Sequence, residues 1–383
     1  MKSIIIIAFN NELDKVLKIL RKENVIIKYI VSCPTSDLGD ILRDNCVQCP
    51  VAMYHELPEI LRNTYFDYVI ISDVKKYVGV PRRIVRDCEL SGCRANQIID
   101  VSDFYTPEVF PLYNLVQNYL TDENVLPEFF ITGVSHAYAG TNISCYAKLG
   151  LNLAFTSQDL FLDYELAKMV LKKKGNLKYA LIAIAPFSLH YDLSKSVNTH
   201  RMLLYYPMIK KMHNSAIGTG DLQCLFNEAF FRAFVDFDTK LSFPQRMYSV
   251  VTDCCISMDD YINIRNSFKD WDIKEYPETV QENREIVRNY LQLVISKGII
   301  PILVMFPLTS YYNRYFSKKK FDEVRDFCKT VSGEYNVQFL DLSGDERFYD
   351  GDFYDAEHLN SKGAAKVSKI LSDVMFGSES RGI

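Results

Sequence analysis

Apolar residues in the first hundred positions form short continuous runs that alternate with stretches of helical spacing. The runs lie at residues 3–9, 24–32, 66–73 and 96–104. Between them, apolar side chains recur every three or four positions, as they do from Leu13 to Leu20. Continuous apolar runs indicate strands buried on both faces. Strands that alternate with helices favour a parallel sheet covered by helices on both sides.

The same alternation of apolar runs and helical spacing returns in the second part of the chain, where one long segment interrupts it. Strands are predicted at residues 129–132, 152–155, 178–186, 299–307 and 337–342, and helices at 158–174, 282–298, 318–331 and 361–375. Residues 190–275 are rich in Tyr, Phe and Met at helical spacing, which predicts a helical insertion. We therefore expect an α/β protein with two doubly wound parallel-sheet domains, 1–105 and 128–383, joined by a helical connector at 106–127.

The composition of the chain bears on whether it binds nucleic acid and whether it crosses a membrane. The 383 residues are 48% hydrophobic and 24% charged, with a net charge of −4, so nothing favours a nucleic-acid partner. No apolar run approaches the length of about 18 residues that a membrane span needs. The apolar run at the N-terminus is followed by polar residues without the cleavage site of a signal peptide. We expect a cytoplasmic protein.

The spacing of cysteines argues against a structural metal site, and that of glycines argues against a Rossmann-type dinucleotide site. Ten cysteines without a secretory signal are expected to be free thiols. Cys46 and Cys49 form a CxxC pair, but Cys88 and Cys93 have four residues between them, so we expect no metal site. The turn after the first predicted strand has no GxGxxG pattern, which argues against dinucleotide binding of the usual Rossmann kind.

Two short motifs carry the candidate chemistry: GVSH (133–136), after a predicted strand, and DAEHLN (355–360), before the last predicted helix. Ligands bind at the carboxyl ends of parallel strands, so we expect both motifs to face one site. A serine hydroxyl needs a base to become a good nucleophile, and His358 is suited to that role, with Asp355 placed to orient its ring. Taken alone, Ser135 would be read as a helix cap.

With these motifs, residues 128–376 resemble the SGNH hydrolase superfamily, the insertion excepted. ITGVSH stands where that family has its GDS nucleophile block, and DAEHLNSKGAAKVSKIL matches its closing DxxH block. The resemblance implies a flavodoxin-like fold for the second domain. It also implies Ser135 as the nucleophile, His358 as the base and Asp355 as the orienting carboxylate.

The two middle blocks depart from the family pattern. NLAFTSQD (152–159) has Ser157 where the oxyanion glycine is expected, and IAPFSLHYD (184–192) lacks the usual Asn. We expect the oxyanion donors to be Ser135, Ser157 and Ser188. Losing one donor typically costs about 2.7–4 kcal/mol of transition-state stabilisation. Substrate contacts are expected from the residues near these blocks: His136, Asn152, Gln158 and His190.

The N-terminal domain is similar to the Rossmann-like domains of sugar-modifying acyltransferases and other glycan-biosynthesis proteins. The run that carries this likeness is CPVAMYHELPEILRNTYFDYVIISD (49–73). Together the two resemblances imply a serine O-acyl esterase or O-acyltransferase that acts on a glycan or sugar nucleotide in polysaccharide biosynthesis, with acetyl-CoA as a candidate acyl donor. The alternatives are a non-catalytic protein that binds a glycan or nucleotide sugar, and another group transferase acting on a sugar.

Overall fold

The computed structural model folds into two compact units, one formed by Met1–Phe110 with Thr199–Lys240 and the other by Pro111–Asn198 with Leu241–Ile383. The described residues are 2–8, 13–20, 25–33, 38–72, 80–94, 97–100, 109–196, 198–215, 217–221, 224–225, 259, 262, 265, 268 and 275–377. Among them, no helix combines the length and the apolar character that a membrane crossing requires.

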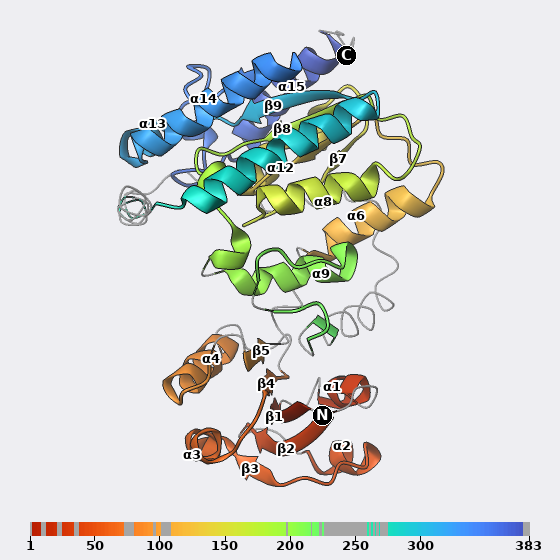
Figure 1. Cartoon of the computed structure of the whole chain (residues 1–383), viewed down its shortest axis with the longest axis vertical. Coiled ribbons are helices and arrows are strands. Elements are labelled where there is room, and N and C mark those ends of the chain that lie inside the picture. The colour runs from red at the N-terminus through yellow and green to blue at the C-terminus, as the bar shows by residue number, and fades with distance from the viewer. Residues whose placement is uncertain are drawn as a thin grey trace. The chain divides into compact units, whose positions relative to one another are not determined.

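The first unit is built around a five-stranded parallel sheet (Figure 1). Its strands are β1 (Lys2–Ala8), β2 (Val25–Ser32), β3 (Val51–Met53), β4 (Tyr68–Ile71) and β5 (Ile98–Asp100). Its helices are α1 (Leu13–Leu20), α2 (Gly39–Asp44), the short η1 (Tyr54–Glu56), α3 (Leu57–Asn63) and α4 (Val80–Leu90). The strand order is β3-β2-β1-β4-β5, so the chain runs outward from β1 in both directions, as in doubly wound sheets.

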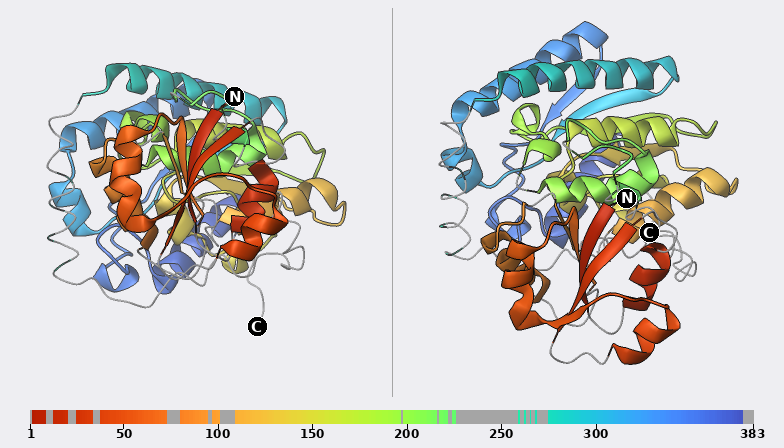
Figure 2. Two further views of the ribbon diagram at one scale, coloured as in Figure 1. Left: turned by 90° about the horizontal axis from the view of Figure 1, so that it is seen from below. Right: turned by 60° about the horizontal axis from the view of Figure 1, so that its bottom comes forward.

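Both faces of β1 and β4 in this sheet are buried, as their continuous apolar runs predict. Ile5, Ile7 and Val69 pack with side chains of α3 and α4 in one core cluster. Leu13 and Val16 of α1 are fully buried as well. Figure 2 shows the strands of this unit between α1 and α2 on one side and α3 and α4 on the other.

The second unit holds another five-stranded parallel sheet. Its strands are β6 (Phe129–Thr132), β7 (Gly150–Asn152), β8 (Tyr179–Ala183), β9 (Ile300–Met305) and β10 (Gln338–Asp341). Numbered from one within the unit, their spatial order is 2-1-3-4-5, which is the flavodoxin-like order. The two parallel sheets confirm the predicted α/β class with two doubly wound domains.

Helices cover both faces of the second sheet. They are α7 (Ser135–Gly140), α8 (Leu160–Val170), α12 (Pro277–Ser296), α13 (Ser310–Tyr315), α14 (Lys318–Tyr335) and α15 (Ser361–Phe376), with α6 (Val109–Thr121) beginning in the first unit and continuing here. Ile131 and Leu181 pack with Leu371 of α15. On the opposite face, the Thr132 hydroxyl lies 3.0 Å from the hydroxyl of Tyr290 in α12.

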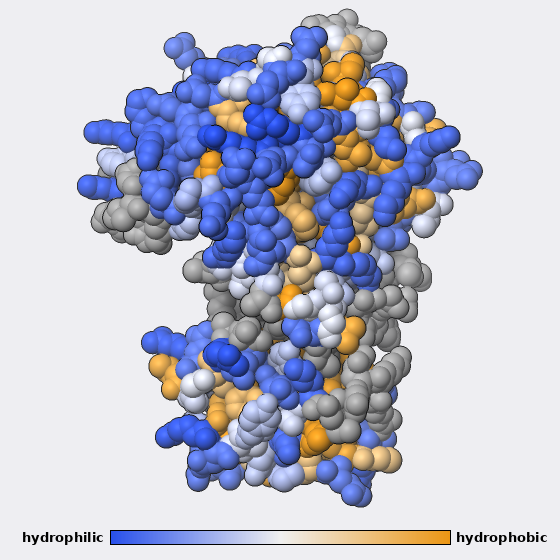
Figure 3. All heavy atoms as spheres, viewed as in Figure 1, coloured by the Kyte–Doolittle hydropathy of each residue, from blue (hydrophilic) through white to orange (hydrophobic). Residues whose placement is uncertain are grey.

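Short helices fill several connections. They are η3 (Ile143–Cys145), η4 (Ser188–His190), η5 (Leu193–Lys195), η6 (Thr199–Arg201), α9 (Met202–Ile209) and η7 (Asp350–Asp352). Of these, η5, η6 and α9 lie within the predicted insertion at 190–275, much of which falls outside the described residues. Hydrophilic side chains predominate on the face of the second unit that Figure 3 shows.

Candidate functional site

The end of β6 and the start of α7 position Ser135. All four residues of β6 are buried, and the chain turns at Gly133, whose φ is +147°. A Cβ atom at this position would lie 2.7 Å from the Cβ of Ala183 in β8, so only glycine fits without displacing the neighbouring strand. Ser135 is the first residue of α7, and its backbone N–H therefore has no partner within the helix.

A tight loop positions His358. The backbone N–H of Tyr354 donates to the carbonyl of His358 at 3.0 Å, and a bridge joins Phe353 to Leu359. Within the loop, Asp355 Oδ1 accepts the backbone N–H groups of Glu357 at 2.8 Å and of His358 at 2.7 Å. Such local carboxylate–backbone bonds favour a turn, so Asp355 shapes the loop that carries His358.

Neighbouring elements anchor this loop on both sides. Asn360 Oδ1 accepts the backbone N–H groups of Lys362 and Gly363 at 3.0 and 3.1 Å, and so caps the N-terminus of α15. Thr309, before α13, donates its hydroxyl to the carbonyl of Ala356 at 2.5 Å. The loop is therefore tied to both helices that flank it.

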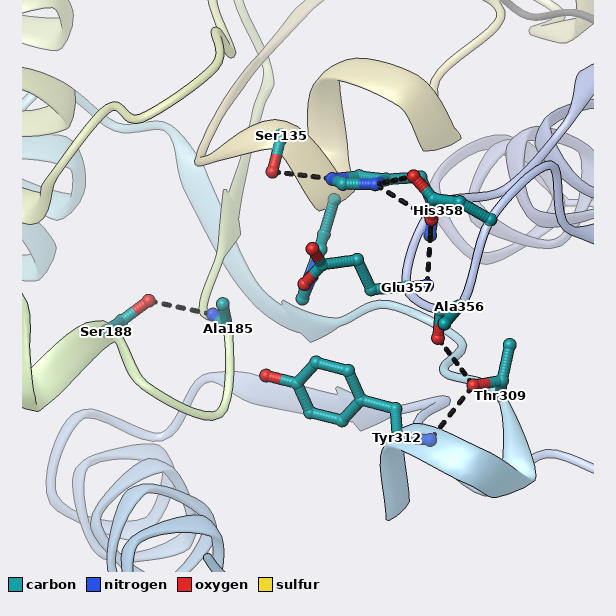
Figure 4. Close-up of polar contacts among 10 residues, drawn as sticks. Ser135, Ala185, Ser188, Thr309, Tyr312, Ala356, Glu357 and His358 are labelled. Atoms are coloured by element: carbon teal, nitrogen blue, oxygen red, sulfur yellow. Dashed lines mark hydrogen bonds and ion pairs between the residues drawn. The ribbon is translucent and has the colours of Figure 1, made fainter. Parts of the chain in front are cut away.

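The two motifs meet in space. His358 Nε2 lies 2.8 Å from Ser135 Oγ, and His358 Nδ1 lies 2.8 and 3.0 Å from the two carboxylate oxygens of Asp355 (Figure 4). The ring of Tyr354 stacks on the imidazole with 5.5 Å between centroids and 14° between planes. Ser135, His358 and Asp355 thus have the hydrogen-bond distances that general-base activation of a hydroxyl requires.

Charge at the site favours a protonated imidazole. Burial acts to lower the pKa of His358, but the hydrogen bond with Asp355 and the charges of Glu357 and Asp355 outweigh burial and raise it above 6.5. For Asp355, burial acts to raise the pKa, and the contact with His358 together with two backbone N–H bonds lowers it overall. The site is therefore arranged to stabilise the ion pair that forms once the base has taken a proton.

His136 lies beside the base. Its ring centroid is 5.6 Å from that of His358 and 5.8 Å from that of Tyr312, and its Nε2 is 3.5 Å from Glu357 Oε2. Atoms of His136, Glu357 and His358 that are able to bind a metal lie within 4.8 Å of one another. However, both ring nitrogens of His358 already face Ser135 and Asp355, so a cation would have to displace one of these contacts.

Of the other expected oxyanion donors, Ser157 lies in the turn before α8 and Ser188 is the first residue of η4. Ser157 has a left-handed backbone with φ of +59°, and its carbonyl accepts the hydroxyl of Tyr191 at 3.2 Å. The Ser188 hydroxyl accepts the backbone N–H of Ala185 at 2.8 Å, and Figure 4 shows it turned toward Ala185 rather than Ser135. The roles of Ser157 and Ser188 stay predictions.

Two of the other expected substrate contacts, Asn152 and Gln158, form hydrogen bonds within the protein, although the buried Nδ2 of Asn152 has no partner among the described residues. Asn152 Oδ1 accepts the N–H of Ala154 at 3.0 Å. Gln158 Nε2 donates to Asp163 Oδ1 at 2.5 Å, and the same carboxyl group accepts the backbone N–H of Gly133, so Gln158 is linked to the turn before Ser135.

His190, the remaining expected contact, faces α14. Its Nε2 lies 3.4 Å from Glu323 Oε2, and burial is the largest of the causes that lower its pKa. No described contact joins it to Ser135 or His358. The structure therefore brings together Ser135, His136, Asp355 and His358 from the predicted set.

Sequence reasoning missed three residues at this site. Glu357 lies inside the DAEHLN motif. Its residue type and its spacing from His358 do not show that its side chain points in a different direction from that of Asp355. Tyr312 comes from α13, outside both motifs, and reaches the site only through the fold. Thr309 supports the loop through a backbone carbonyl, and such a contact leaves no sequence signature.

Comparisons with known proteins give a fold-level likeness only. No family model matches the sequence, and no curated protein matches it. The solved structures that resemble the chain include one named as a platelet activating factor from Streptococcus pneumonia, at 12% identity and a TM-score of 0.37, covering 70% of this chain and 91% of that one. They also include a lipolytic protein of the G-D-S-L family from Desulfitobacterium hafniense DCB-2, at 13% identity and a TM-score of 0.32, covering 64% and 99%. We base the function on side-chain geometry.

Proposed function

We propose that the second unit is a serine O-acyl esterase or O-acyltransferase. The observation that supports it is the continuous line of hydrogen bonds from Ser135 Oγ through His358 to Asp355, with 2.8 Å at each step. The role of a helix cap alone would not explain why Ser135 is hydrogen-bonded to a histidine 223 residues away, or why a carboxylate orients that histidine.

The proposed reaction has two displacements. Ser135 Oγ bonds to the acyl carbonyl carbon while its proton passes to His358 Nε2. The bond to the leaving alcohol then breaks as that alcohol takes the proton from His358. Water or a second hydroxyl attacks the acyl-enzyme, gives its proton to His358, and releases the acyl group as Ser135 recovers a proton. Water as acceptor gives an esterase, and an alcohol gives a transferase.

Two features would assist these steps. Asp355 would hold the ring with Nε2 toward Ser135 and stabilise the imidazolium. The backbone N–H of Ser135 would donate to the oxyanion, with Ser157 as the second expected donor. A glycan or sugar-nucleotide substrate, acetyl-CoA as acyl donor and a place in polysaccharide biosynthesis stay predictions from the sequence.

Turnover of 4-nitrophenyl acetate tests this proposal. Ser135→Ala should lower kcat/KM by about 10³-fold or more, since residues of such a triad act as a unit. Ser296→Ala, which removes an exposed hydroxyl at the end of α12, is the matched control and should behave as wild type. A fluorophosphonate should label Ser135 in the wild-type protein. Equal turnover by wild type and Ser135→Ala would overturn the proposal and favour a binding-only protein.

A further inference from the structure

Three polar side chains form a cluster next to the proposed base. His136 comes from α7, Tyr312 from α13, and Glu357 from the loop that also carries His358. Figure 4 shows the Tyr312 hydroxyl and the Glu357 carboxylate on the same side of the His358 ring. We call His136, Tyr312 and Glu357 the polar cluster; the proposed mechanism gives its members no step.

Two atoms of the polar cluster lack hydrogen-bond partners within the part of the chain that the structure describes. These are the hydroxyl of Tyr312 and Nε2 of His136, although this Nε2 lies 3.5 Å from Glu357 Oε2 as an ion pair. The two residues are only 0% and 4% exposed. A buried polar group without a partner costs about 1–3 kcal/mol, so proteins rarely leave a hydroxyl such as that of Tyr312 in this state unless something else bonds to it.

Charge defines what the polar cluster offers. Burial acts to raise the pKa of Glu357, but the contact with His136 and the charges of His358 and His136 lower it overall, which keeps the carboxylate ionised. Burial and the charge of Glu357 raise the pKa of Tyr312 well above 10, which keeps the phenol protonated. The cluster therefore presents an acceptor, a donor and an imidazole nitrogen that is able to act as either.

The polar cluster is also reachable. The side chain of Glu357 is 33% exposed, while His136 and Tyr312 form the buried side behind it. A molecule that approaches Ser135 past Glu357 would therefore meet this carboxylate first, and the two buried groups once the Glu357 side chain turns aside. An acyl chain would leave them without partners, whereas a hydroxyl group both donates to a carboxylate and accepts from a phenol.

We propose that the polar cluster binds hydroxyl groups of a polyhydroxylated substrate, a sugar residue, next to the acyl group that Ser135 attacks. This inference rests on the proposed function. In this inference the Glu357 carboxylate accepts a hydrogen bond from a sugar hydroxyl, and the Tyr312 hydroxyl donates one. His136 contacts both of these residues. The substrate class is thus an O-acylated or acyl-accepting sugar rather than a simple lipid ester.

Partition of the acyl-enzyme tests the inference. The acetyl-enzyme is formed from 4-nitrophenyl acetate, and its transfer to a panel of methyl glycosides is compared with transfer to 1-propanol at equal hydroxyl concentration. Wild type should prefer at least one glycoside. Tyr312→Phe should lower that preference by about threefold to tenfold, as expected for one lost hydrogen bond. Glu357→Gln should lower it further, because a bond to a charged group is stronger.

Tyr311→Phe is the matched control, since Tyr311 precedes Tyr312 in α13 and packs on Tyr315 instead. It should keep the wild-type preference. Tyr312→Phe should also melt at or above the wild-type temperature, because it removes a buried hydroxyl that has no partner among the described residues. A lower melting temperature would mean that the hydroxyl is bonded within the protein and would overturn its assignment.

The outcomes separate the two proposals. No burst of 4-nitrophenol in the wild type would overturn the proposed function, and the inference with it. A burst without preference for any glycoside over 1-propanol, or a preference unchanged in Tyr312→Phe, would overturn the inference alone. Inhibition by micromolar Zn²⁺ that Glu357→Gln relieves would identify the polar cluster as a cation site and would also overturn it.

Discussion

At the scale of single residues, His358 is influenced by two carboxylates with different positions. Asp355 contacts its Nδ1 directly, whereas Glu357 acts on it through charge without a hydrogen bond between the side chains. Both favour the protonated ring and so raise its pKa above 6.5. A base of this kind binds a proton strongly during the reaction, at the cost of being idle at low pH.

The pH profile of turnover should show this effect. Protonated His358 cannot accept the proton of Ser135, so kcat/KM should rise with pH through an apparent pKa above 6.5. Glu357→Gln removes a negative charge that favours the imidazolium, so the rising limb should move to lower pH. The measurement is kcat/KM for 4-nitrophenyl acetate across pH 5–9, the range in which a raised histidine pKa is expected to fall.

Glu346→Gln is the control for this experiment. Glu346 is an exposed acid in the segment before the DAEHLN loop, so its loss changes net charge equally while leaving the site's contacts intact. Its profile should match that of the wild type. A limb that does not move in Glu357→Gln would contradict the electrostatic role given to this carboxylate.

At the scale of secondary-structure elements, the turn between β6 and α7 is the most constrained part of the site. The positive φ of Gly133 disfavours a side chain, and an added Cβ would lie only 2.7 Å from the Cβ of Ala183. Gly133→Ala should therefore cost about 1–3 kcal/mol of stability by overpacking and should also displace Ser135 from His358. Urea denaturation and 4-nitrophenyl acetate turnover measure the two effects.

Gly333→Ala serves as the comparison for this substitution. Gly333 lies in α14, and nothing lies within 4 Å of where its Cβ would be. Alanine at a helical position should leave stability unchanged or raise it by up to about 1 kcal/mol. If Gly133→Ala were as stable and as active as Gly333→Ala, the close approach to β8 would not constrain the turn.

The length of each helix or strand explains which parts of the fold could be predicted from the sequence. Strands buried on both faces, such as β1 and β4, can be predicted from the sequence because their residues form continuous apolar runs. By contrast, β3 has three residues with only the middle one buried, and α2 buries none of its side chains. Patterns that short cannot be told from a loop. The site followed the same rule: its motif residues were predicted, whereas Tyr312 reaches it only through tertiary folding.

At the scale of the whole molecule, two sheets each have a hydrophobic core of their own. Ile71 belongs to the core of the first unit and Leu181 to that of the second, and both are fully buried. Independent cores predict unfolding in more than one step, since a single cooperative transition is expected only where one core holds the chain together.

Calorimetry of two variants checks this prediction. Ile71→Ala and Leu181→Ala should each cost about 2–5 kcal/mol, and each should lower the temperature of a different transition. Activity should be lost along with the transition that Leu181→Ala shifts, because Ser135 and His358 belong to the same unit as Leu181. If both variants moved one common transition by similar amounts, the two cores would not unfold separately.

The separation of Ser135 and His358 along the chain also has a consequence for synthesis. During translation Ser135, the proposed nucleophile, emerges first, and 223 further residues must follow before His358, its proposed base, is available. Contacts between such distant positions form late, because the chain entropy of a long loop opposes them. Nascent chains and products of premature termination would therefore carry an ordinary, unreactive serine. Only a chain completed through the DAEHLN motif would form the hydrogen bond between Ser135 and His358 on which the proposed function rests.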